Sequence, residues 1–336
     1  MNNSVFVKLA VFATFLAMVV VILGAYTRLS DAGLGCPDWP GCYGHLDVPD
    51  SHKDVSAANQ AYPDRPVVAH KAWKEMIHRY FAGTLGIVIF SMAFLAWRHR
   101  RHGRQLRFVP FLLVAIVIFQ ALLGMWTVTI KLNPSIVMSH LLGGFTTLSL
   151  VWWCSLRQGG LFTARTMYES TLKPLQGLAL LALIVVALQI MLGGWTSSNY
   201  AALACGSYFP TCQGQWWPPM DFKEGFVLWR GTQLNFEFGV LHNDARMAIQ
   251  MVHRIGAVVT LLIVGFLAWR LLVLRGARNL RSMGALLLLI LSLQIALGIG
   301  NVLLQLPLLN AVAHNAVGAL LLLTVVTINH AVNPGK

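Results

Sequence analysis

The sequence contains few charged residues. Only 11% of its 336 residues are charged, whereas 57% are hydrophobic, and this composition excludes an ordinary soluble domain. Acidic residues are scarcer than basic ones, with 12 against 25. Cysteine is scarce too: there are five, and no second Cys or His pair at zinc-finger spacing accompanies the close cysteine pairs. This shortage disfavours a structural zinc site.

Eight apolar stretches are long enough to cross a bilayer as helices, which takes about 20 residues each. They cover approximately 6–27, 74–97, 107–129, 134–156, 174–197, 246–270, 282–304 and 309–331. The first stretch is too long for the hydrophobic region of a signal peptide, and no Ala-x-Ala cleavage site follows it, so we expect an uncleaved span. The sequence therefore predicts an all-α polytopic membrane protein.

The basic residues predict the orientation of the spans. They gather in the connections between spans two and three, four and five, and six and seven: Arg98, Arg100, Arg101, Arg104, Arg107; Arg157, Arg165, Lys173; Arg270, Arg275, Arg278, Arg281. By the positive-inside rule, these connections and both termini are cytoplasmic in a multi-pass protein of the cell (inner) membrane. Topology accounts for the basic clusters, so we expect the lipid bilayer as a partner and no nucleic acid.

Two long loops, 28–73 and 198–245, then face outward. Four of the five cysteines lie in these loops, in the pairs Cys36 and Cys42, and Cys205 and Cys212. An outer location permits disulfides, and metal binding is the competing interpretation of close cysteines. We predict one disulfide within each pair and a free thiol at Cys154, near the cytoplasmic end of span four.

Four histidines recur in the two halves of the chain. His78 and His253 lie 175 residues apart and each precedes an arginine, while His140 and His314 lie 174 residues apart. A polar ring in lipid is energetically costly, so four of them at repeated positions indicate a function. The alternative for any single one is a satisfied hydrogen bond between helices.

The duplication extends to other segments. The matching segments are Gly24–Thr27 with Gly193–Thr196, and Gln120–Gly124 with Gln294–Gly298. We therefore expect eight transmembrane helices as two pseudo-symmetric four-helix bundles, 1–157 and 174–336, joined by a cytoplasmic linker, 158–173. Each half has an even number of spans, so the axis relating them runs along the membrane normal. The glycines of the apolar stretches are interpreted as helix packing only: Gly124, Gly143, Gly144, Gly193, Gly194, Gly298 and Gly318.

The histidines are arranged as haem ligands would be. All four lie at similar depth toward the outer face, on the second and fourth helix of each half. Two opposed imidazoles in a bundle core match bis-histidine haem ligation. Zinc and copper normally take three or four protein ligands, and each half offers only two.

Two further residue types accompany the histidines. Arg79 and Arg254 follow theirs directly, and a guanidinium there can pair with haem propionates or anchor the helix end at the headgroups. Glu75 lies three residues before His78, where its carboxyl can handle protons, whereas the matching Gln250 cannot. The alternative for Glu75 is an exposed glutamate at a helix start, favoured by the helix dipole.

These residues carry a resemblance to a known family. The matching motifs are Gly24-Ala-Tyr-Thr-Arg28-Leu-Ser-Asp-Ala-Gly33-Leu-Gly35-Cys36-Pro-Asp-Trp39-Pro-Gly-Cys42, Glu75-Met-Ile-His78-Arg79, Ser139-His140, His253-Arg254 and His314-Asn315. They span nearly the whole chain, which resembles the cysteine-containing branch of the haem A synthases. These membrane oxidoreductases oxidise a methyl group of haem O to the formyl group of haem A for terminal oxidases.

The resemblance implies that the two halves of the chain bind different haems. It implies that His253 and His314 ligate a resident haem b. It places haem O, the substrate, near His78 and His140, with Arg79 beside it and Glu75 important for function. The expected partners are haem O synthase, assembly factors of terminal oxidases, and an electron donor or acceptor of unknown identity.

Two other functions compete with this interpretation. A non-catalytic b-type cytochrome or haem carrier explains four histidines but leaves the difference between Glu75 and Gln250 unexplained. A quinone-linked disulfide oxidoreductase explains the outer cysteines but gives the histidines no role.

Overall fold

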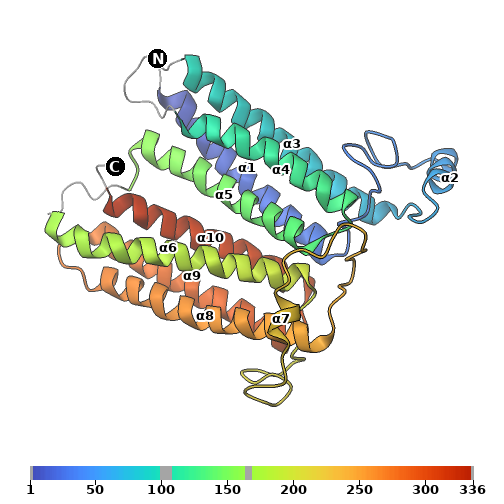
Figure 1. Ribbon diagram of the computed structural model, residues 1–336. Coiled ribbons are helices and arrows are strands. Elements are labelled where there is room, and N and C mark those ends of the chain that lie inside the picture. Colours follow the sequence, from blue (N-terminus) through green and yellow to red (C-terminus); the bar gives the residue numbers. More distant parts are fainter. Residues whose placement is uncertain (1–2, 99–107, 163–168, 334–336) are drawn as a thin grey trace.

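The computed structural model describes residues 3–98, 108–162 and 169–333 (Figure 1). Apart from two isolated β-bridges, the regular structure of this part is helical. Its helices are α1 (Asn3–Leu29), α2 (His52–Ala61), α3 (Ala69–Arg98), α4 (Val109–Thr129), α5 (Pro134–Gly159), α6 (Glu169–Ser198), α7 (Phe222–Gly225), α8 (Asn243–Leu272), α9 (Arg278–Leu303) and α10 (Leu308–Val332).

Eight of these helices are long and apolar enough to cross a membrane. They are all but the short α2 and α7, and they confirm the eight predicted spans. Long apolar segments become helices in lipid because every backbone polar group must then be satisfied within the segment. The expected basic cluster at 99–107, the linker segment 163–168 with Arg165, and residues 334–336 lie outside the described residues.

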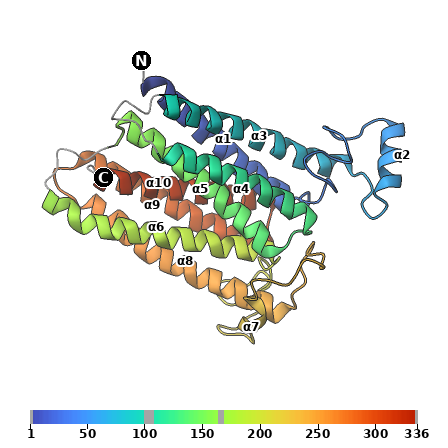
Figure 2. The same ribbon diagram turned by 45° about the horizontal axis from the view of Figure 1, so that its top comes forward.

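The eight spans form two rings of four. In the first ring α1 packs on α3 and α5, and α4 packs on the same two helices. In the second ring α6 packs on α8 and α10, and α9 packs on the same two. The rings meet through α5 with α6, α1 with α10, and α5 with α10. If the four helices of the first ring are exchanged, in chain order, with those of the second, the set of three contacts is unchanged, as a twofold axis requires (Figures 1 and 2).

The core between the rings is apolar. Fully buried side chains from both halves belong to one cluster, among them Leu148, Leu267 and Val325. Across it, Trp152 Nε1 on α5 donates to Thr327 Oγ1 on α10 at 2.8 Å. Between helices in lipid, close packing and a few such hydrogen bonds supply the stability.

The two cysteine loops have the same local structure. Cys36 and Cys42 form a disulfide, as do Cys205 and Cys212, and Cys154 is a buried free thiol in α5. All three predictions about cysteine are confirmed. In each loop the second cysteine makes a β-bridge to the third residue after it, so the duplication includes these loops although their sequences differ.

The second cysteine loop, between α6 and α8, also crosses to the first half. Its residue Gly231 accepts a hydrogen bond from Asn133 Nδ2 at 3.1 Å, and Phe236 N donates to Lys131 O at 3.0 Å. Asn133 at the same time caps α5 by accepting the Ser135 N–H at 3.1 Å. The loop therefore holds the N-terminal end of α5, the helix that carries His140.

Candidate functional site

The first histidine pair meets across the centre of its ring. His78 lies on α3 and His140 on α5, two helices that are diagonal in the ring and not packed on each other. Their ring centroids are 6.4 Å apart and the ring planes are nearly perpendicular, at 87°. The Nδ1 atoms of both rings are buried and have no hydrogen-bond partner.

The second pair occupies the same places in the second ring. His253 lies on α8 and His314 on α10. Here both rings contact glutamine amides: Gln189 Nε2 lies 3.1 Å from His253 Nδ1, and Gln294 Nε2 lies 3.3 Å from His314 Nε2. His314 Nδ1 is buried without a partner.

Each imidazole lies against a glycine of the neighbouring helix. A Cβ atom at Gly24 would lie 3.0 Å from Cε1 of His78, and the corresponding distances to Cε1 of His140, His253 and His314 are 3.5, 3.3 and 3.0 Å. The glycines in question are Gly24, Gly124, Gly193 and Gly298. Helix packing alone is therefore an incomplete interpretation of the last three, because they also leave room for imidazole rings.

Glu75 is buried in the first half. It is 5% exposed and lies six residues after the start of α3, so it is not the exposed helix-start glutamate of the alternative interpretation. Its Oε2 accepts the N–H of Cys36 at 3.0 Å, and its Oε1 forms an ion pair with Arg79. The matching Gln250 is equally buried, at 4%, and its Oε1 has no partner.

Arg79 binds the cysteine loop above the bundle. Besides Glu75, its guanidinium donates to the backbone oxygens of Asp38 at 3.1 Å and Gly41 at 2.5 Å. Arg254 does the same in the second half, donating to Thr211 O at 2.9 Å and to Tyr208 O at 3.1 Å. The arginine after each histidine thus fixes a disulfide loop over one end of its ring. Pairing of Arg79 with propionates stays a prediction.

The donor set suits a haem better than a bare metal ion. Within the described residues no three His, Cys, Asp or Glu side chains come together as ligands for a metal ion. A haem needs only two axial ligands from the protein. The paired imidazoles, each seated against a glycine, fit that requirement in both halves.

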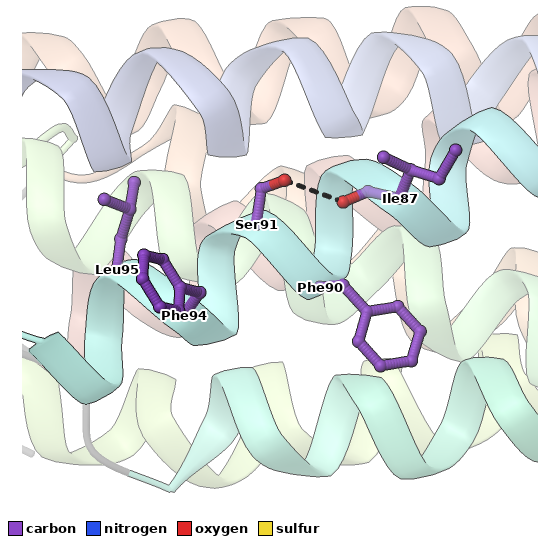
Figure 3. A pocket seen from close by; sticks show the side chains of 5 residues that line it. All are labelled: Ile87, Phe90, Ser91, Phe94 and Leu95. Atoms are coloured by element: carbon purple, nitrogen blue, oxygen red, sulfur yellow. Dashed lines mark hydrogen bonds between the residues drawn. The ribbon is translucent and has the colours of Figure 1, made fainter.

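An apolar hollow of about 520 Å³ lies elsewhere on α3 (Figure 3). It is lined by Ile87, Phe90, Ser91, Phe94 and Leu95, and the Ser91 hydroxyl donates to Ile87 O at 2.9 Å within the helix. It begins nine residues beyond His78, about 13 Å along the helix axis. None of the five side chains is ionisable, so the hollow offers no acid, base or ligand for chemistry.

The fold and the site together define a class: polytopic helical membrane proteins made of two duplicated bundles, each with two histidines facing across its centre. A family model described as cytochrome oxidase assembly protein, COX15-CtaA, matches residues 7–326. The chain belongs to this family, within which it groups with the haem A synthases.

Three relatives illustrate the relationship. A haem A synthase of Shewanella oneidensis is 48% identical over 93% of this chain and 92% of its own length. Haem A synthases of Methylobacterium radiotolerans and Shouchella clausii are 28% and 27% identical over 95% and 88% of this chain, and over 88% and 86% of their own lengths. The family resemblance seen in the sequence motifs is thereby confirmed over nearly the full chain.

Proposed function

We propose that the chain is a haem A synthase, an oxidoreductase that converts a methyl group of haem O into the formyl group of haem A. The high identity to a relative of that name supports the proposal. The observation that carries it is the pair of matched histidine sites that differ at one ionisable position, Glu75 against Gln250.

In this proposal each half has its own task. Residues 1–157 bind haem O between His78 and His140, with Arg79 beside it. Residues 174–336 hold a haem b between His253 and His314, and 158–173 join the halves. The glycine seats in both rings, with the unpartnered Nδ1 atoms of His78, His140 and His314, support binding of a macrocycle in each half.

The reaction proceeds by successive hydroxylation of one carbon. Written with water as the source of oxygen, each hydroxylation adds one OH group and releases two electrons and two protons from the carbon. Two hydroxylations give a gem-diol, which loses water to leave the aldehyde, so an external acceptor takes four electrons in all. The resident haem, when bound, supplies one-electron redox chemistry, and an external redox partner completes the electron balance. His78 and His140 orient the substrate, and Glu75, one helical turn from His78, is the group of this half that takes up or delivers protons.

The cysteine loops and their arginines close the outer end of the site. Arg79 ties the loop of Cys36 and Cys42 to α3, and Glu75 accepts a backbone N–H of the same loop. Excluding water there strengthens the electrostatic contacts inside. The positive-inside rule puts this end on the outer face of the cell membrane and both termini in the cytoplasm. Haem O synthase and oxidase assembly factors are the proposed partners.

Haem extraction tests the proposal. Membranes containing the wild-type chain and a supply of haem O are extracted, and the pigments are separated by chromatography. The expected result is a formyl-bearing product that disappears in His78→Ala. Retained haem without any formyl product in the wild type would favour the non-catalytic cytochrome instead. Haem retained after replacement of the four paired cysteines by serine separates the proposal from the disulfide oxidoreductase, in which the histidines have no role.

A further inference from the structure

One side chain of the second half is buried at the end of the first ring. Phe236, in the second cysteine loop, is 1% exposed, whereas residues 232–235 before it are exposed. Its N–H donates to Lys131 O at 3.0 Å, at the corner between α4 and α5. Its ring lies in an apolar cluster whose other members come from the first half: Leu34, Val128, Leu132 and the partly buried Val137.

The chain around Phe236 is anchored to the first half on both sides. We call residues 228–237 the crossing segment, because they run from α7 across to the ends of α4 and α5 (Figure 1). Before Phe236, Gly231 O accepts a hydrogen bond from Asn133 Nδ2 at 3.1 Å. After it, Glu237 forms an ion pair with Arg65 of the first cysteine loop at 3.0 Å.

The corresponding corner of the second ring lacks these anchors. Ser135 Oγ, like the Asn133 amide, donates to the crossing segment. At the offset of 174 residues between the paired histidines of α5 and α10, the counterparts of Asn133 and Ser135 are Pro307 and Leu309. Neither side chain has a hydrogen-bond donor. Leu309 is 78% exposed, whereas Asn133 is 1% exposed, so the crossing segment is a feature of the first ring.

The Phe236 cluster lies one helical turn from the place of His140. On α4, Val128 follows Gly124 by four residues, and a Cβ atom at Gly124 would lie 3.5 Å from Cε1 of His140. On α5, Val137 precedes His140 by three residues. Residues three or four apart lie on the same face of a helix. Packing in this cluster therefore sets how α4 and α5 meet around the His140 ring.

The same cluster reaches the loop that holds Glu75. Leu34 lies two residues before Cys36, whose N–H donates to Glu75 Oε2 at 3.0 Å. Removing a large buried side chain leaves a cavity that the surrounding structure fills only in part, and its neighbours shift as they do so. Phe236 therefore fixes α4, α5 and this loop relative to one another.

We propose that Phe236 is a positioning residue of the first histidine site, which keeps His140 and Glu75 in place for the substrate haem. Through this side chain the second half takes part in the site of the first. The inference rests on the proposed binding of haem O between His78 and His140.

Titration of the purified full-length protein with haem O tests the proposal. Binding to the first half is the absorbance change that is missing in His78→Ala. Phe236→Ala is expected to bind haem O more weakly and with part of its iron high-spin, because a displaced His140 no longer ligates it. Haem A formation is expected to fall by up to about 100-fold, since a displacement of about 1 Å can have that effect. The resident haem spectrum should stay as in the wild type.

Two further variants serve as controls. Phe238→Ala removes the same ring two residues later, where it is 61% exposed, and is expected to bind haem O as the wild type does. Phe236→Leu keeps part of the buried apolar volume. Its affinity for haem O is expected to lie between those of the wild type and Phe236→Ala.

The outcomes separate positioning from general loss of structure. Affinity and spin state in Phe236→Ala equal to those of the wild type would overturn the proposal, as would an equal loss of the resident haem from the folded variant. If Phe236→Ala does not fold, Phe236→Leu decides alone, and wild-type affinity there overturns the proposal. A wild type that binds haem O in its first half but forms no haem A would instead contradict the proposed function, whatever Phe236 does.

Discussion

Replacing Glu75 by glutamine removes the ionisable group that distinguishes the two halves. The side chains of Glu75 and Arg79 are 7% and 13% exposed, so their ion pair is largely shielded from water. Removing one partner of a buried pair costs about 3–5 kcal/mol when the other charge is left uncompensated. Arg79, however, keeps the backbone oxygens of Asp38 and Gly41.

The second half shows that this arrangement is stable with glutamine. Arg254 binds its cysteine loop through backbone oxygens while the position matching Glu75 carries Gln250. In Glu75→Gln, the new amide oxygen can still accept the N–H of Cys36. The substitution then removes one charge-assisted hydrogen bond, that between Arg79 and residue 75. We expect this loss to weaken the docking of the loop by about 1.5–3 kcal/mol. We expect the protein to fold and the resident haem spectrum to stay almost intact.

The expected loss is in catalysis. Without an ionisable group one turn from His78, formyl production falls sharply or stops at a hydroxylated intermediate. Chromatography of haem extracted from membranes with matched protein levels measures this. Gln250→Glu is the control and is expected to create no second reactive site, because in the proposed assignment the second half has no pocket for the substrate haem. Wild-type levels of haem A in Glu75→Gln would refute the proposed role of Glu75.

Three further changes test particular contacts. In Gly193→Val, the new side chain enters the space of the His253 imidazole, whose Cε1 lies 3.3 Å from the Cβ position, so the resident haem spectrum should be lost. The control Gly177→Val should keep the spectrum, because nothing lies within 4 Å of its Cβ position. The Arg65–Glu237 ion pair, at 3.0 Å and partly exposed, joins the two cysteine loops. Glu237→Gln should lower the free energy of unfolding by about 0.2–1 kcal/mol, and this loss should be smaller at high salt. Burial raises the pKa of the Tyr43 phenol above its ordinary value of 10.0. Above about pH 10 the unfolded chain therefore releases this proton before the folded protein does, and the free energy of unfolding should fall as the pH rises further. An absorbance titration should show a late tyrosine ionisation that is absent in Tyr43→Phe.

The sequence predicts the elements of this fold well because lipid imposes a simple rule. A long apolar run becomes a helix, and the structure has its eight spans where the hydropathy puts them. The duplication also predicts that the second and fourth helices of each half bring their histidines together. The pairing of the cysteines follows from their closeness in the chain, and the structure confirms it.

Contacts between helices are what the sequence does not reveal. That Gly193 makes room for His253, or that Arg79 reaches the carbonyl of Gly41, depends on how each helix is rotated about its axis. The repeat alone does not tell which atom Gln189 meets. The burial of Glu75 is a similar case. The sequence around it is compatible with an exposed or a buried carboxylate, and it is buried because the loop of Cys36 folds over α3.

The most direct test of the two-site account is a reduced-minus-oxidised spectrum of purified protein carrying His253→Ala, with His78→Ala measured beside it. The account predicts a low-spin, bis-histidine b-type spectrum in the wild type that persists in His78→Ala and is largely lost in His253→Ala. A full wild-type spectrum in His253→Ala would contradict it, because the resident haem would then have its ligands elsewhere.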